Sequence, residues 1–160
     1  MNISEIRNIL SQVPDPEIPV ISIEELGILQ DIKIEDNKIV VYITPTYNGC
    51  PAMDMITVNI KSALEDNGYN NVEVKLVLSP IWTTDWITEE GKKKLLEYGI
   101  APPAERTTDL SFIDGKSPSI ACPQCGSKDT EIISRFGSTA CKSLYKCNQC
   151  LEPFDYFKCH

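Results

Sequence analysis

Cys122-Pro-Gln-Cys125 and Cys147-Asn-Gln-Cys150 are the stretches that decide how the C-terminal part of this chain folds. A two-residue spacer lets both sulfurs of one tight turn reach a single ion at about 2.3 Å, and two such turns complete a tetrahedron. The two pairs are separated by 21 residues, one more than the usual upper limit for a four-thiolate zinc site. Gly126 supplies the permissive backbone that the first turn needs. These four cysteines are therefore the predicted metal ligands.

A metal ion would also solve a stability problem of the tail. A segment of about 40 residues buries too little apolar surface to fold alone, whereas structural zinc supplies roughly 10–16 kcal/mol of apparent binding free energy. Zinc is the predicted occupant, with iron, an iron–sulfur cluster or a metal-free core of reduced cysteines as alternatives. Cys141, six residues before Cys147, is a candidate substitute ligand, or else a small buried apolar side chain.

Cysteine usage and composition indicate the compartment. The chain has 160 residues, of which 42% are hydrophobic and 24% charged, as in ordinary globular proteins. Seven cysteines, an odd number, favour thiolates that hold metal in a reducing compartment over a disulfide framework. No apolar run approaches the ~20 residues of a membrane-spanning helix, and the first residues lack a signal-peptide pattern. We therefore expect a cytoplasmic protein with no membrane contact.

Charge disfavours nucleic acid as a partner. The formal net charge is −8, from 15 basic and 23 acidic residues. Residues 121–160 carry five basic and four acidic groups, a net charge of +1, which leaves −9 on the rest of the chain. A net acidic surface repels phosphate backbones. We therefore expect no nucleic-acid binding.

The first hundred residues alternate between predicted helices and strands. Apolar residues at helical spacing predict the helices, and runs rich in β-branched residues predict the strands. The first two strands are expected to form a hairpin around a short polar turn at 35–38, and Ser22-Ile-Glu-Glu25 has the spacing of a capping box. Trp82 and Trp86 fit core or interface anchors, with a substrate cage as the alternative. The expected helices are 3–13, 52–67 and 88–98, and the expected strands are 29–34, 39–44, 72–78, 131–135 and 142–146.

A change in composition predicts two domains. From Ala101 to Ser119 the chain is rich in Pro, Thr, Ser, Asp and Gly and poor in large apolar residues, which is typical of a linker. We therefore expect one domain over residues 1–100, a linker over 101–119, and a second domain over 120–160.

A second candidate site centres on Cys50, in the loop Thr46-Tyr-Asn-Gly-Cys-Pro51 immediately before a predicted helix. Backbone N–H groups at a helix N-terminus stabilise a thiolate and lower its pKa, so a reactive or metal-binding cysteine fits this position. Asp15 and Glu17 lie on another irregular, proline-rich loop and are expected near it. The alternative is an inert, packed cysteine with acids that only cap turns.

Two sets of residues carry a resemblance to known families. Asp15-Pro-Glu-Ile-Pro19, Ile23-Glu-Glu-Leu-Gly27 and Asn48-Gly-Cys-Pro51 resemble the SufT-like domain of iron–sulfur cluster carriers and targeting factors. Arg135-Phe-Gly-Ser-Thr-Ala-Cys-Lys142 and Glu152-Pro-Phe-Asp-Tyr-Phe-Lys158 resemble the PaaD (PaaJ) family, encoded with the phenylacetyl-CoA epoxidase. The resemblance implies an α+β fold: a small mixed sheet with flanking helices, followed by a short four-cysteine zinc ribbon of β-strands.

The resemblance also implies a function in aerobic phenylacetate degradation. It implies an accessory subunit of the multicomponent epoxidase, not its catalytic subunit, that assists iron–sulfur cluster or iron assembly into the oxygenase or reductase. The single histidine, His160, agrees with this, because a di-iron site in a helical bundle needs more histidines. A structural subunit that bridges the oxygenase components, without metal transfer, is the alternative.

The resemblance makes Cys50 the candidate acceptor of iron or a transient iron–sulfur cluster, with Asp15 and Glu17 shaping its loop. A [2Fe–2S] cluster generally takes four ligands, so one cysteine requires help from another chain. The expected partners are therefore the oxygenase and reductase components of the epoxidase, iron–sulfur assembly proteins, and a second copy in a homodimer.

Overall fold

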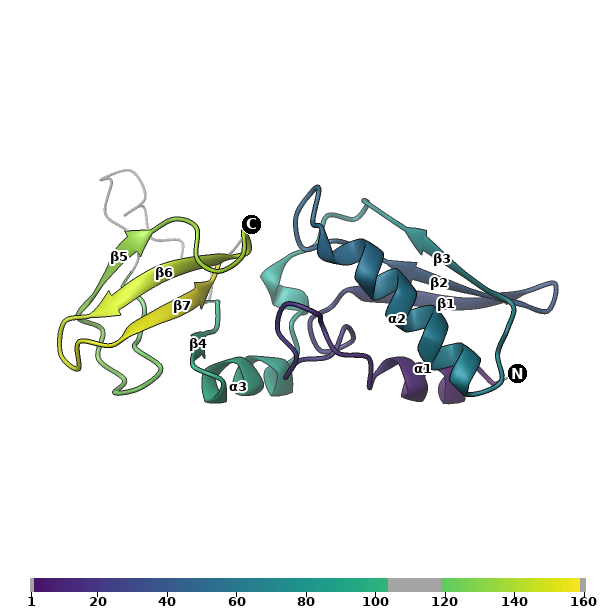
Figure 1. The fold of residues 1–160 in the computed structure, drawn as a ribbon, viewed down its shortest axis with the longest axis horizontal. Helices are drawn as coiled ribbons and strands as arrows, with labels where there is room; N and C mark the ends of the chain where they lie inside the picture. Colours follow the sequence, from purple (N-terminus) through teal and green to yellow (C-terminus); the bar gives the residue numbers. More distant parts are fainter. Residues whose placement is uncertain (1, 104–118, 159–160) are drawn as a thin grey trace. The chain divides into compact units, whose positions relative to one another are not determined.

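The computed structural model describes residues 2–103 and 119–158 and divides the chain into two compact units (Figure 1). The division falls between Gly91 and Lys92, inside helix α3 (Glu89–Glu97). Most of the linker expected over 101–119 lies outside the described residues. The units before and after this division are called the N-terminal and the C-terminal unit, and each is described by itself.

The N-terminal unit contains a three-stranded mixed sheet with helices, as the sequence predicts. Strands β1 and β2 are antiparallel, whereas β2 and β3 are parallel, and the order in the sheet is β1-β2-β3. The predicted fold class is confirmed. The elements are α1 (Ile3–Leu10), β1 (Leu29–Glu35), β2 (Lys38–Ile43), α2 (Ala52–Asp66), β3 (Val72–Leu76) and the short 3-10 helix η1 (Thr84–Trp86).

The hairpin between β1 and β2 is the one expected from its polar turn. Asp36 and Asn37 both have positive φ, 47° and 63°, and Glu35 pairs directly with Lys38. Asx residues tolerate this left-handed conformation, which a tight two-residue hairpin turn requires. The turn chemistry therefore sets the register of the first two strands.

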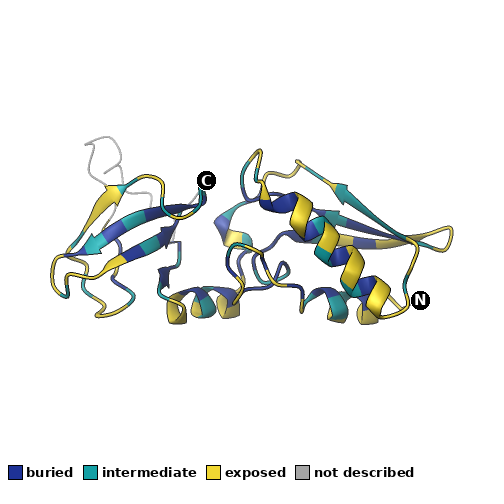
Figure 2. Cartoon of the chain, viewed as in Figure 1, coloured by how far each residue is buried: buried dark blue, intermediate teal, exposed yellow. Residues whose placement is uncertain are grey.

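One face of this sheet and one stripe of α2 form the core of the N-terminal unit. Helix α2 packs against β3 and α1, and Figure 2 shows buried and exposed residues alternating along it. The apolar spacing that predicted α2 is the spacing of its buried side chains, which is the pattern of a helix with one core-facing stripe. Buried side chains on these two surfaces include Ile39, Val41 and Ile43 of β2 and Ile56, Ile60 and Leu64 of α2.

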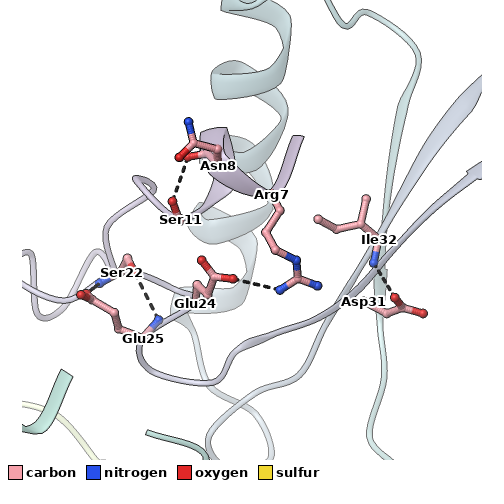
Figure 3. Close-up of polar contacts among 8 residues, drawn as sticks. All are labelled: Arg7, Asn8, Ser11, Ser22, Glu24, Glu25, Asp31 and Ile32. Carbon is pink, nitrogen blue, oxygen red and sulfur yellow. Dashed lines mark hydrogen bonds and ion pairs between the residues drawn. The ribbon is translucent and has the colours of Figure 1, made fainter. Parts of the chain in front are cut away.

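The segment between α1 and β1 is irregular but closely bonded (Figure 3). The predicted capping box is present: the Ser22 N–H donates to the Glu25 carboxylate (2.9 Å), and the Glu25 N–H donates to the Ser22 hydroxyl (3.2 Å). The Arg7 guanidinium pairs with Glu24 at 2.9 Å. The two bonds of the capping box satisfy backbone N–H groups that no helix or strand satisfies here.

Trp82 lies in the core of the N-terminal unit, which fits an anchor and not a substrate cage. Its side chain is only 1% exposed, and its indole N–H donates to the Leu26 carbonyl at 3.0 Å. The Thr88 N–H donates to the Glu25 carbonyl at 2.9 Å. The segment from Trp82 to Thr88 is therefore hydrogen-bonded to the turn at the end of the capping box. More than fifty residues separate this segment from the turn in sequence.

The C-terminal unit contains a four-stranded sheet in the order β4-β7-β6-β5. The two strands expected near 131–135 and 142–146 are confirmed as β5 (Thr130–Ser134) and β6 (Lys142–Cys147). Two strands were not expected, β4 (Ile100–Ala101) and β7 (Pro153–Phe157). Strand β4 has only two residues, and β7 starts with a proline, so neither has the local signal that periodicity analysis needs.

A small aromatic cluster is the core of the C-terminal unit. The ring of Tyr145 stacks on Phe154 (centroids 5.9 Å apart) and meets Tyr156 edge-on (5.6 Å). Buried Cys122 and Cys147 belong to the same cluster, with Ala101 and Ile120. So small a core agrees with a fold that depends on metal. Across the residues described, no helix has the length and apolarity to cross a bilayer.

Candidate functional site

The four cysteines of the two Cys-x-x-Cys turns meet at one point of the C-terminal unit. Their sulfur atoms all lie within 4.8 Å of one another. The Cys122 and Cys150 sulfurs are 3.7 Å apart, and those of Cys125 and Cys147 are 3.5 Å apart. Four sulfurs placed tetrahedrally at 2.3 Å from one ion are about 3.8 Å apart. The donor set and its spacing therefore fit a four-thiolate metal site.

Backbone bonds shape the first cysteine turn. The Gly126 N–H donates to the Cys122 carbonyl (2.8 Å), and the Cys122 N–H donates to the Ser127 carbonyl (2.9 Å). Gly126 has φ of +75°, a conformation that glycine adopts without steric cost. The glycine after the first pair therefore has the role that the sequence predicts.

Asp129 holds the second cysteine turn, a role that the sequence analysis missed. Its carboxylate accepts hydrogen bonds from the side-chain amides of Asn148 (3.0 Å) and Gln149 (3.3 Å), which are the two spacer residues between Cys147 and Cys150. These bonds lower the pKa of Asp129. The only hint in the sequence was the two amide side chains, Asn148 and Gln149, between the cysteines. Their presence does not indicate which carboxylate they would contact.

The thiols differ in how readily they lose their protons. Backbone N–H groups of Cys150 and Gln149 lower the pKa of Cys147 to about 7, although burial opposes them. The Glu152 N–H acts in the same direction on Cys150, but burial and the neighbouring thiols raise the pKa of Cys150 to about 12. A bound cation would offset the repulsion among four thiolates and would lower the pKa of Cys150. Metal binding at this site is therefore expected to release protons.

Cys141 lies outside this group of four sulfurs. It is buried, and its sulfur lies 2.9 Å from the Thr139 hydroxyl oxygen. A buried position outside the group of four sulfurs fits the small apolar side chain that was the alternative to a substitute ligand. His160 and Cys159 lie outside the described residues.

Cys50 is half-buried directly before α2, and its pKa differs from the prediction. Burial raises the pKa of the Cys50 thiol, and the carboxylates of Glu17 and Asp15 raise it further. Hydrogen bonds from the Ala52 backbone and the Tyr47 side chain lower it, but they do not compensate. The expected net lowering is therefore wrong, because desolvation and two negative charges outweigh the helix N-terminus.

The expected proximity of Asp15 and Glu17 to Cys50 is seen in this electrostatic effect. Asp15 also has a structural contact: its buried carboxylate accepts the backbone N–H groups of Glu17 (2.9 Å) and Ile18 (2.8 Å). Such a bond from an aspartate to the backbone two residues on defines an Asx turn. Asp15 therefore caps the proline-rich loop and at the same time faces the Cys50 region with negative charge.

Replacing Glu17 with glutamine is expected to accelerate alkylation of Cys50 at mildly alkaline pH by a factor of roughly three. Removal of this negative charge lowers the Cys50 pKa, and only the thiolate reacts. Timed iodoacetamide treatment followed by peptide mass spectrometry separates Cys50 from the ribbon cysteines. Glu35→Gln removes the same charge at a position that does not act on this thiol and is the matched control. Equal rates in wild type and Glu17→Gln would contradict the coupling.

Comparison with known proteins assigns each unit to a family. Residues 3–76 match the iron–sulfur cluster assembly protein family, and residues 106–158 match the PaaD zinc beta ribbon domain. The chain is thus an iron–sulfur assembly domain joined to a zinc ribbon with a four-cysteine metal-binding site. It is 47% identical over 157 residues to an Escherichia coli protein named as one subunit of a "Putative 1,2-phenylacetyl-CoA epoxidase", covering 98% of this chain and 93% of that protein. The chain belongs to the PaaD family.

Two further relatives match only the N-terminal part. An Fe-S protein maturation auxiliary factor of Porphyromonas gingivalis is 33% identical over 97 residues, which cover 59% of this chain and 89% of that protein. The crystal structure of a DUF59 domain from Bacillus anthracis superposes with a TM-score of 0.54 at 29% identity, over 57% of this chain and 89% of that one. The mixed sheet with flanking helices is therefore the fold of that domain.

Proposed function

We propose that the protein is an accessory maturation factor of a phenylacetyl-CoA epoxidase in the cytoplasm. It assists the assembly of an iron–sulfur cluster, or of iron, into the oxygenase or its reductase, and is not itself the enzyme. The observation that carries this proposal is the union of an iron–sulfur assembly domain with a PaaD zinc ribbon in one chain. Near full-length similarity to a protein named as an epoxidase subunit supports it.

The two sites have different roles in this proposal. Cys122, Cys125, Cys147 and Cys150 hold a structural zinc ion that stabilises the C-terminal unit. Cys50 accepts the cargo, because it lies on an irregular loop at a helix start, with two carboxylates nearby that attract a cation. The cargo is iron or a transient cluster, and the iron–sulfur assembly proteins and epoxidase components supply the remaining ligands.

The raised pKa of Cys50 means that its thiol is mostly protonated at neutral pH, which affects how it binds metal. A protonated thiol binds metal weakly, and binding releases its proton. Cys50 is therefore expected to hold cargo only when an incoming iron centre displaces the proton. A weak, transient site of this kind suits transfer more than storage.

Cys50→Ala is the experiment that tests the proposal. The epoxidase oxygenase and reductase are co-produced with wild-type or Cys50→Ala protein, and iron and acid-labile sulfide are measured in the purified reductase. Cys50→Ala is expected to keep its own zinc but to yield a reductase that lacks most of its cluster. Cys141→Ala, which removes a different thiol outside the metal site, is the control and should leave the reductase fully loaded. A fully loaded reductase with Cys50→Ala would refute the transfer role.

One observation favours a second candidate, a bridging subunit without metal transfer. An inert cysteine packed beneath a helix would also be half-buried and would also have a raised pKa, as Cys50 does. In that case the protein remains in a stoichiometric complex with the oxygenase components through purification, and Cys50→Ala does not change that complex or its cluster content. The same two preparations therefore distinguish the candidates.

A further inference from the structure

Strand β3 (Val72–Leu76) is an open edge of the sheet in the N-terminal unit. It is hydrogen-bonded to β2 on one side, and among the described residues no strand is bonded to its other side (Figure 1). The outer side of an edge strand presents backbone N–H and C=O groups that can form hydrogen bonds with another strand.

The residues that present these groups follow from the bonds to β2. The Asn71 carbonyl accepts the Ile39 N–H (2.9 Å), and the Val77 N–H donates to the Ile43 carbonyl (2.8 Å). Both residues have odd numbers, and backbone groups alternate in direction along a strand. The backbone groups of the even-numbered residues Val72, Val74 and Leu76 therefore point to the open side.

The side chains of β3 are complementary to themselves. Glu73 and Lys75 stand on one face on either side of Val74; Lys75 pairs in register with Tyr42 and lies over its ring at 5.9 Å. On the other face Leu76 is 53% exposed at one end of the strand, and Val72 lies at the opposite end. When the strand is reversed about Val74, the acid on one side of this centre meets the base on the other side, and the apolar residues at the two ends meet each other.

We propose that β3 pairs antiparallel with β3 of a second copy of this chain, centred on Val74. In this register Val74 is opposite Val74, Glu73 is opposite Lys75, and Val72 is opposite Leu76. The even-numbered residues form the hydrogen-bonded pairs, as their outward backbone groups require. The two Glu73–Lys75 pairs fall at non-hydrogen-bonded positions, where side chains approach most closely. The two three-stranded sheets become one sheet of six strands.

Two ion pairs within the chain keep Glu73 negatively charged, which this pairing requires. Glu73 already lies 3.1 Å from the Lys38 ammonium and 3.8 Å from that of Lys75, and the Lys38 bond lowers the pKa of Glu73. Glu73 is therefore ionised at neutral pH. Across the two-fold axis the four charges of Glu73 and Lys75 alternate in sign, and Leu76 loses exposed apolar surface against Val72 of the other copy.

This dimer differs from one held together by a cluster between two Cys50 residues. Cys50 follows the carboxyl end of β2, and β3 is parallel to β2. Antiparallel pairing of β3 directs the carboxyl ends of the two copies away from each other. The two Cys50 loops then lie at opposite ends of the joined sheet, so each meets its cargo independently of the other.

Charge reversal tests the register. Sedimentation velocity of the full-length, zinc-loaded chain from micromolar to near-millimolar concentration should show a reversible dimer. Glu73→Lys and Lys75→Glu each place like charges opposite one another, and each should weaken dimerisation about tenfold or more. A mixture of these two variants restores opposite charges at every pair, so it should form a heterodimer. Cys50→Ser should dimerise as the wild type does.

Matched controls and folding checks keep the test decisive. Glu65→Lys and Lys61→Glu make the same charge changes on exposed positions of α2 and should dimerise normally. Circular dichroism melts should show that the variants remain folded. A wild-type chain that stays monomeric, a dimer that Glu73→Lys leaves unchanged, a mixture that fails to associate, or a dimer that Cys50→Ser abolishes would each overturn the proposal.

Discussion

Cys147→Ser is expected to abolish zinc binding and to unfold the C-terminal unit. Cys147 is fully buried, belongs to the aromatic core cluster, and lies 3.5 Å from the Cys125 sulfur. Serine is a poor zinc ligand, so the variant loses much of a binding free energy that is roughly 10–16 kcal/mol for small zinc domains. The rest of that small core cannot replace it. The expected result is less than one zinc per chain and loss of the dispersed amide signals of residues 119–158 in NMR spectra.

Cys141→Ala is the matched control for this prediction. It removes another buried cysteine of the same unit, one that lies outside the group of four sulfurs. It should keep one zinc per chain and a folded C-terminal unit. In both variants the signals of the N-terminal unit should persist, because other residues form its core. Full zinc content in Cys147→Ser, or loss of zinc in Cys141→Ala, would show that the ligand set is different.

Gly27→Ala is expected to destabilise the N-terminal unit by about 3 kcal/mol or more. Gly27 has φ of +75°, and a Cβ at this position would lie 2.7 Å from the Trp86 Cβ and 2.9 Å from the Trp86 carbonyl oxygen. Backbone atoms cannot move aside as a flexible side chain does. The clash therefore adds to the cost of left-handed backbone and forces the segment around η1 away from the turn.

Gly68→Ala separates the steric clash from the backbone effect. Gly68 has φ of +86°, but a Cβ there would meet no atom within 4 Å. Its substitution should cost only about 1 kcal/mol, the usual cost of a left-handed alanine. Urea unfolding of the two variants, followed by tryptophan fluorescence, measures the difference. Equal loss of stability in both would contradict close packing of Trp86 on Gly27.

The consequences of Gly27→Ala should extend to the Cys50 region. The turn that contains Gly27 follows the loop capped by Asp15, and the Asp15 N–H donates to the Ile21 carbonyl at 2.9 Å. The same turn is bonded to Trp82 and Thr88 from a distant part of the chain. The position of the two carboxylates near Cys50 therefore depends on packing between segments far apart in sequence.

Features that local chemistry controls could be predicted from neighbouring residues alone. The hairpin turn at Asp36 and Asn37, the capping box from Ser22 to Glu25, the amphipathic α2 and the metal-binding cysteine turns are all set by residues a few positions apart. Each depends on a backbone preference or a spacing that the neighbouring residues specify. Such features can be predicted without knowledge of the tertiary structure.

Features that depend on distant partners became visible only in the folded chain. Strand β4 pairs with β7 across more than fifty residues, and Asp129 reaches Asn148 and Gln149 from another strand end. The pKa of Cys50 depends on burial and on two acids from another loop, and these reverse the effect of the helix start that the sequence displays. Desolvation and charge act through space and not along the chain. A local sequence pattern therefore predicts where the Cys50 thiol lies, whereas the folded structure sets its pKa.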